Sequence, residues 1–215
     1  MPAASTSRRQ VLTDFRRKEI IAAALKTFGA KGFAATRAED IAVQAGIAKG
    51  TLYLYFGSKE DIYVAAVQHA IDQLNERIKD RLESVCGIRE RIAAFVMARL
   101  EFWLEQKSLY RLLLTVGRET RHRKQTNALL RATTRSLITL FEEGVAAGEL
   151  KAQPFEAIAW GVVDMLCGAN ERRLDGIAVH SIEEDARFVI DVTLLFVGFE
   201  ETRPLNEAVA LGNDG

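Results

Sequence analysis

Residues 36–60, with the sequence TRAEDIAVQAGIAKGTLYLYFGSKE, constrain the fold of this chain more than any other stretch. The pattern is typical of two short amphipathic helices that meet at Gly46 and are followed by a third helix that opens at Ser58. A chain that turns sharply between crossed helices often needs a residue with positive φ, which glycine adopts without a Cβ clash. The stretch therefore predicts a helix-turn-helix.

Local signals support the two short helices. We expect Thr36 to cap the first one, because its hydroxyl can accept an unpaired amide proton, and Glu39 completes a capping box three positions later. Ile41 and Ala42 lie on the inward face of that helix, where a small side chain lets the partner helix approach closely. Leu52 is the expected inward anchor of the second helix.

The second helix keeps basic, small and aromatic residues for its outer face: Lys49, Gly50, Thr51, Tyr53 and Tyr55. In a helix-turn-helix this helix enters the major groove of DNA, so these residues are candidate DNA contacts. Lys59 follows the Ser58 cap, where an ammonium and free backbone amides together suit a phosphate. Packing of the aromatic residues in an ordinary helical core is the alternative interpretation.

Several short motifs occur here in order: IIAAALKTFGAKGF at 20–33, DIA at 40–42, AGI at 45–47, KGTLY at 49–53 and SKED at 58–61. With Thr36, Tyr55 and Phe56, they resemble the tetracycline-repressor (TetR) family of bacterial regulators over about 50 of the 215 residues. The resemblance implies an all-helical homodimer with a three-helix DNA-binding head and a larger ligand-binding body. It also implies a repressor that a small-molecule effector releases from DNA.

The resemblance assigns DNA contacts to the positions that match the family's motif: Thr36, Lys49, Gly50, Thr51, Tyr53, Tyr55 and Lys59. Ala48 departs from this motif, because the family often has serine there, and we expect no hydroxyl contact from that position.

The charge of the chain is unevenly distributed along the sequence. The whole chain has a net charge of zero, but residues 1–60 hold 10 Lys or Arg against 5 Asp or Glu, a net charge of +5. Residues 61–215 hold 19 and 24, a net charge of −5. The positive charge therefore falls on the segment expected to meet phosphates, although chance segregation is the alternative.

Composition limits the other classes of protein. The chain is 48% hydrophobic, enough for a sizeable core, and no run of 18 uncharged apolar residues predicts a membrane span. Cys86 and Cys167 are too few for a disulfide scaffold, so we expect two free thiols and a cytoplasmic location.

We expect four segments: a flexible arm at 1–13, a DNA-binding domain at 14–60, a ligand-binding and dimerisation domain at 61–203, and a tail at 204–215. The expected fold class is all-α with about nine helices. Outside the helix-turn-helix they cover roughly 14–31, 58–85, 88–105, 109–116, 118–147, 154–173 and 181–202. Arg8 and Arg9 of the arm either stay solvated or reach into a minor groove.

The last two helices are candidates for a dimer interface. Residues 188–199 carry only one charged side chain, Asp191, and a helix that is apolar nearly all round must be covered on more than one side. A second copy of the chain supplies that cover in a four-helix bundle, which predicts a homodimer on a palindromic operator in double-stranded DNA. Burial within one monomer is the alternative.

A small-molecule site is expected between the body helices. Its candidate residues are mostly apolar with a few polar groups, as is typical of ligand sites: Phe102, Trp103, Tyr110, Leu113, Leu114, Trp160, Asp164, Cys167 and Asn170. Core packing is the alternative for the aromatic residues, and a structural ion pair is the alternative for Asp164.

Catalysis has little support in the sequence. His69, His122 and His180 are scattered, and neither a metal-ligand spacing nor a nucleophile elbow nor a glycine-rich phosphate loop occurs. We therefore expect a ligand-responsive transcriptional regulator without cofactor or metal. A ligand-independent DNA-binding protein and a helical enzyme or carrier are the alternatives.

Overall fold

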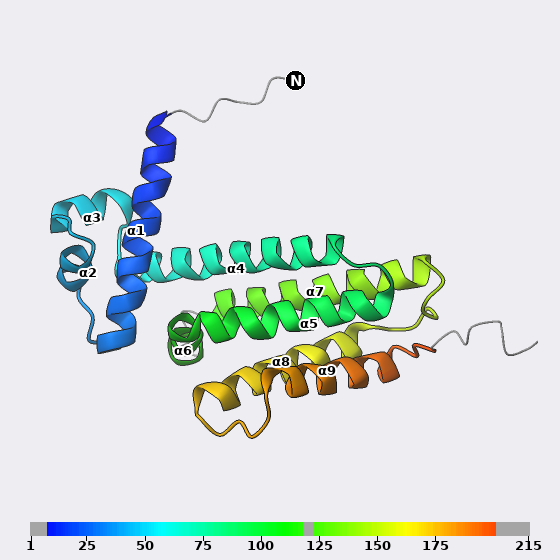
Figure 1. Ribbon diagram of the computed structural model, residues 1–215. Helices are drawn as coiled ribbons and strands as arrows, with labels where there is room; N and C mark the ends of the chain where they lie inside the picture. The colour runs from blue at the N-terminus through cyan, green and yellow to red at the C-terminus, as the bar shows by residue number, and fades with distance from the viewer. Residues whose placement is uncertain (1–7, 118–122, 201–215) are drawn as a thin grey trace, which may run out of the picture.

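The computed structural model describes residues 8–117 and 123–200, and all regular structure in these ranges is helical (Figure 1). The helices are α1 (Arg8–Lys31), α2 (Ala38–Gln44), α3 (Lys49–Tyr55), α4 (Lys59–Glu83), α5 (Ile88–Glu105), α6 (Lys107–Val116), α7 (Arg123–Ala146), α8 (Glu156–Leu174) and α9 (Ile182–Phe196). The all-α class and the number of helices expected from the sequence are confirmed for this part of the chain.

The molecule has a head at one end and an elongated helical body. The head consists of α1, α2 and α3, and α4 leads out of it along the body (Figure 1). In the body, α5 is central and packs against α4, α7, α8 and α9. The short helix α6 lies at the end of the body nearest the head, where it packs against α1.

Apolar side chains at helical spacing hold the head together. Ile20 and Phe28 of α1, Ile41 of α2, Leu52 of α3 and Ile62 of α4 are all at most 4% exposed. Burial of side chains of this size stabilises a fold by about 1.5–3 kcal/mol each. The three head helices thus share one core with the start of α4, which fixes the head to the body.

The turn of the helix-turn-helix has the predicted geometry. Gly46 has a φ of +65°, which confirms the expected positive value, and Leu52 is only 1% exposed. Ser58 is the N-cap of α4, because its hydroxyl accepts a hydrogen bond from the Asp61 amide at 3.1 Å. These three local predictions are confirmed.

The cap predicted for α2 is wrong by one residue. Arg37 is the N-cap, and the Asp40 carboxylate accepts a hydrogen bond from the Arg37 amide at 2.9 Å. Thr36 is buried instead, and its hydroxyl donates to the carbonyl of Gly32 at 2.7 Å. The hydroxyl therefore closes the turn after α1 rather than the start of α2, and Glu39 is left for another partner.

Several helix ends differ from the sequence prediction. Residues 8–13, expected in the arm, are the first residues of α1, because no glycine or proline interrupts the chain there. The last helix ends at Phe196 rather than near 202, and Gly198 follows with a φ of +70°. The side chains of Arg8 and Arg9, the segment 118–122 with His122, and the tail at 204–215 lie outside the described residues.

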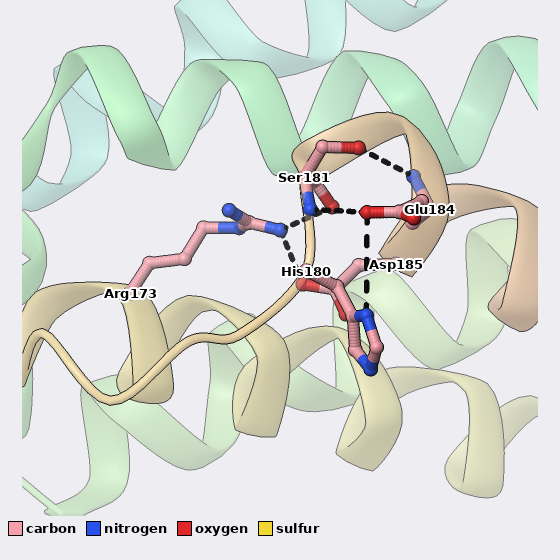
Figure 2. Close-up of polar contacts among 5 residues, drawn as sticks. All are labelled: Arg173, His180, Ser181, Glu184 and Asp185. Carbon is pink, nitrogen blue, oxygen red and sulfur yellow. Dashed lines mark hydrogen bonds and ion pairs between the residues drawn. The ribbon is translucent and has the colours of Figure 1, made fainter.

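A cluster of polar groups joins α8 to α9 (Figure 2). Ser181 and Glu184 form the predicted capping box at the start of α9. Arg173, near the end of α8, donates to the Ser181 carbonyl at 2.7 Å and forms an ion pair with Asp185. The Arg173 and Asp185 side chains are only 14% and 12% exposed, so this pair locks the two helices together across their loop.

Candidate nucleic-acid interface and ligand cavity

Helix α3 presents an exposed face made of the residues predicted to contact DNA. Lys49, Gly50 and Tyr53 are exposed and Thr51 is half-buried, while Leu52 points into the core. A Cβ added to Gly50 meets no atom within 4 Å, so the backbone here is bare on its outer side. This face is open to a double helix.

Lys49 is held by a partner that DNA can replace. Its ammonium forms an ion pair with Glu39 of α2 and lies 5.9 Å from the centre of the Tyr53 ring. Hydrogen bonding to Lys49 lowers the pKa of Glu39, and hydrogen bonding to Glu39 raises the pKa of Lys49. Because both side chains are about half exposed, water screens the pair and a phosphate oxygen can take the place of the carboxylate.

Tyr55 lies at the edge of this face rather than on it. Its side chain is half-buried against the head core. Its carbonyl accepts a hydrogen bond from Arg17 of α1 at 2.6 Å, and the same guanidinium lies 4.3 Å from the centre of the Phe56 ring. A cation at the last carbonyls of a helix is favourable, so Arg17 fixes the end of α3.

The structure gives Lys59 a role that differs from the predicted phosphate contact. Its ammonium donates to the carbonyls of Phe33, Ala34 and Thr36 at 2.9, 3.2 and 3.1 Å. It also lies 4.7 Å from the centre of the Phe33 ring. An ammonium has only three N–H groups, so these carbonyls use all of them. Lys59 therefore ties the turn between α1 and α2 to the start of α4.

A cavity of about 490 Å³ lies between α5, α6, α7 and α8. Six of the residues proposed from the sequence line it: Trp103, Tyr110, Leu113, Leu114, Asp164 and Cys167. Phe102, Trp160 and Asn170 are absent from its lining. Phe102 follows a different face of α5, where its ring lies 5.4 Å from the guanidinium carbon of Arg77.

Tyr110, Cys167 and Arg99 form a polar part of the cavity wall. The Tyr110 hydroxyl donates to the carbonyl of Cys167 at 3.3 Å, and burial raises the pKa of Tyr110 and of the Cys167 thiol. Both groups are therefore protonated at neutral pH. Arg99 also lines the cavity and is 8% exposed, and burial lowers its pKa to about 10.

Sequence reasoning missed Arg99, although a signal for it exists. It follows Phe95 by four residues and precedes Trp103 by four, which places it on the buried face of α5. A charged residue at such a position is rarely buried without a reason, and it marks a candidate site.

The cavity and the head share the helix α6. Tyr110, Leu113 and Leu114 of α6 line the cavity, and the same helix packs against α1. A Cβ added to Gly29 of α1 lies only 3.4 Å from the Ser108 hydroxyl of α6, so the two helices approach closely. The helix α6 therefore connects the cavity directly to the head.

Large apolar side chains remain uncovered on α9. Phe188, Leu195 and Phe196 are 62%, 76% and 61% exposed.

Within residues 8–117 and 123–200, no group of His, Cys, Asp or Glu is arranged to hold a metal ion. In the same ranges no helix is long and apolar enough to cross a membrane.

Comparison with known proteins decides the family. Residues 20–66, which cover the helix-turn-helix and its supporting helices, match the model of bacterial regulatory proteins of the tetR family. The chain belongs to the TetR family. The predicted DNA-binding regulator is confirmed at this level, and the enzyme alternative is excluded because the family consists of regulators.

Individual proteins that are similar to this chain extend the comparison. The fatty acid metabolism regulator protein of Bacillus subtilis is 27% identical over 135 residues, 62% of this chain and 70% of that protein. The transcriptional activator FasR of Mycolicibacterium smegmatis is 33% identical over 100 residues, 46% of each chain. The structure of FadR from Bacillus subtilis in complex with stearoyl-CoA has a TM-score of 0.74 at 21% identity, covering 82% of this chain and 96% of that one.

Proposed function

We propose that this TetR-family protein is a homodimeric repressor that a small molecule releases from a palindromic operator. The observation that carries this proposal is the position of α6, which lines the ligand cavity on one side and packs against α1 of the head on the other. A body without a cavity near the head would favour a ligand-independent DNA-binding protein instead.

The exposed face of α3 is the proposed reading surface. Thr51 and Tyr53 have polar groups that can reach base edges, and Gly50 allows the backbone to approach closely. Lys49 is the proposed phosphate contact, because its ammonium lies at the surface beside a carboxylate that it can leave. Lys59 and Thr36 hold the turn between α1 and α2 and so support the head rather than contact DNA.

The exposed apolar face of α9 supports a homodimer. A second copy that covers Phe188, Leu195 and Phe196 removes large apolar side chains from water in both chains. Two-fold symmetry then presents two copies of α3 to major-groove faces about 34 Å apart, or a multiple of that distance, and the operator repeats accordingly.

The proposed effector carries a long alkyl or acyl chain. The cavity is lined in part by the apolar side chains of Trp103, Leu113, Leu114, Leu129 and Leu130, which suit such a chain. Descriptions of similar proteins support this choice: the matched Bacillus subtilis protein is a fatty acid metabolism regulator, and the solved structure of FadR from that species holds stearoyl-CoA. The effector acts by binding the arrangement of α6 and α1 that does not fit the operator better than the arrangement that does. Near-complete switching requires a preference of about 5.5 kcal/mol between the two arrangements.

The proposal is tested with operator DNA selected from genomic fragments by the purified protein. Fluorescence anisotropy then measures operator affinity while palmitoyl-CoA is added, with Lys49→Met as a variant that lacks the proposed phosphate contact. We expect palmitoyl-CoA to weaken operator binding at least tenfold, and Lys49→Met to weaken it without an effector. Unchanged operator affinity with the cavity saturated contradicts the release mechanism.

Activation of transcription is the second candidate, because the relative from Mycolicibacterium smegmatis is described as an activator. A reporter gene behind the selected operator separates the two. Deletion of the gene for this protein raises reporter expression if the protein is a repressor and lowers it if the protein is an activator.

A further inference from the structure

Arg99 is a buried cation that faces the ligand cavity. It lies in the middle of α5, with 8% of its surface exposed, and lines the cavity together with Trp103, Tyr110 and Cys167. Its guanidinium carbon is 5.7 Å from the centre of the Phe95 ring.

The guanidinium has no carboxylate partner among the residues that the structure describes. Other arginines of the body do have one: Arg77 binds Glu105, Arg91 binds Glu143 and Arg173 binds Asp185. The polar groups that act on Arg99 are Tyr110 and Cys167, and both are neutral at physiological pH. A buried charge without a partner is costly, so its position beside a cavity calls for a ligand.

The charge on Arg99 persists at neutral pH. Burial lowers its pKa to about 10, which still leaves the group protonated by a wide margin. Arginine also presents a planar set of N–H donors that matches a carboxylate or a phosphate in two parallel hydrogen bonds.

We propose that Arg99 binds the negatively charged group of the effector, so that the effector is an amphipathic anion whose apolar part lies among the aromatic side chains of the cavity. This inference rests on the proposed ligand-responsive function and specifies the chemistry of the ligand. The shared chemistry is an anionic oxygen group, supplied either by a free carboxylate or by a phosphate of a larger conjugate.

Two acidic residues at the cavity raise one alternative, a cationic ligand. Asp164 and Glu171 of α8 line it and raise the pKa of Cys167, but in the described part of the chain neither forms a salt bridge with Arg99. A cationic ligand bound by these carboxylates is the competing possibility, and an amine probe distinguishes it from an anion.

Arg99 also offers a route from the anion to the head. It lines a second cavity of about 470 Å³ between α4, α5 and α7, together with Asn75 and Lys79 of α4. Arg99 therefore borders one cavity lined by α6, which packs on α1, and another lined by α4, which begins in the head. Arg99 thus borders cavities next to both α6 and α4, the two helices that link the body to the head.

The test compares probes that differ only in the polar end of a twelve-carbon chain: dodecanoic acid, dodecanol, dodecylamine and dodecanoyl-CoA. Calorimetric titration of the full chain without DNA measures their affinities. We expect the acid or the thioester to bind at least tenfold more tightly than dodecanol and dodecylamine. Equal binding of the anions and dodecanol, or tighter binding of dodecylamine, overturns the proposal.

Variants locate the charge that makes the difference. Arg99→Met keeps the length of the side chain and should reduce binding of the preferred anion at least tenfold while dodecanol changes less than twofold. Arg99→Lys should retain part of the preference, and Arg123→Met, at an exposed arginine that lines the same cavity, should retain all of it. If Arg99→Met loses binding of dodecanoic acid alone, the group at Arg99 is a carboxylate. If it loses binding of dodecanoyl-CoA alone, the group is a phosphate. No loss with Arg99→Met refutes the proposal.

Thermal unfolding separates this role from a structural one. An unpaired buried charge destabilises the ligand-free protein, so Arg99→Met should unfold at the same temperature as the parent chain or above it. A lower unfolding temperature means that Arg99 supports the fold, which contradicts the proposal. These measurements need no operator, so an anion that binds at Arg99 but does not release DNA refutes the proposed switch and leaves this inference intact.

Discussion

Replacement of Lys59 by methionine distinguishes a structural role from a DNA contact. Lys59→Met keeps the aliphatic stem but removes the donors to the carbonyls of Phe33, Ala34 and Thr36. The bonds to Phe33 and Thr36 are partly buried, and each is worth about 1 kcal/mol net, since an unsatisfied acceptor remains. The ammonium over the Phe33 ring adds about 0.5–1 kcal/mol. We therefore expect a loss of about 2–3 kcal/mol in the free energy of unfolding.

Thermal and urea unfolding of the full chain measure this loss. For a chain of this size each kcal/mol corresponds to about 2–4 °C in Tm, so a decrease of roughly 4–12 °C is expected. Lys49→Met is the matched control, because its ammonium binds only an exposed carboxylate, and it should leave Tm nearly unchanged while reducing operator affinity. A Lys59→Met chain with an unchanged Tm, a weaker operator complex and a shallower salt dependence would refute the structural role and restore the phosphate contact.

Three further predictions address the backbone of α3, the link between α8 and α9, and the dimer. Gly50→Ala should raise the free energy of unfolding by about 0.5–1 kcal/mol in a denaturant titration, because an added Cβ meets no atom there. The same change should weaken operator binding in an anisotropy assay, and an unchanged operator affinity would exclude close approach of DNA to this position. Asp185→Asn should cost about 3 kcal/mol in a denaturant titration, because it leaves the mostly buried charge of Arg173 without its counter-ion, whereas Lys151→Met at an exposed ion pair should cost little. Leu195→Glu, at a side chain that is 76% exposed in one chain, should convert a dimer to a monomer in sedimentation experiments without unfolding it, and an unchanged mass would exclude this face as the interface.

The sequence predicted the features that depend on neighbours along the chain. The positive φ of Gly46 and the Ser58 cap each follow from residues within one helical turn, and both are confirmed. The sequence places the cap of α2 at Thr36, one residue before the observed N-cap Arg37. A contact outside α2 causes the difference, since the Thr36 hydroxyl donates to the carbonyl of Gly32 in the turn after α1.

Features that depend on distant segments were harder to predict. The sequence predicts a phosphate contact for Lys59, because it shows a lysine at a helix start but not the three carbonyls that converge on it from the turn after α1. The lining of the cavity was only partly foreseen. Trp103 and Phe102 are neighbours in sequence, and their positions around α5 place one at the cavity and the other beside Arg77.

The position of α6 has a thermodynamic consequence for the cell. Under the proposed release mechanism, a helix that borders the cavity and also contacts the head makes effector binding and operator binding reciprocal. If the effector lowers operator affinity by some factor, the operator lowers effector affinity by the same factor. Protein bound at an operator would then respond only at higher effector levels than free protein, and the free protein would act as a buffer that fills before the genes respond.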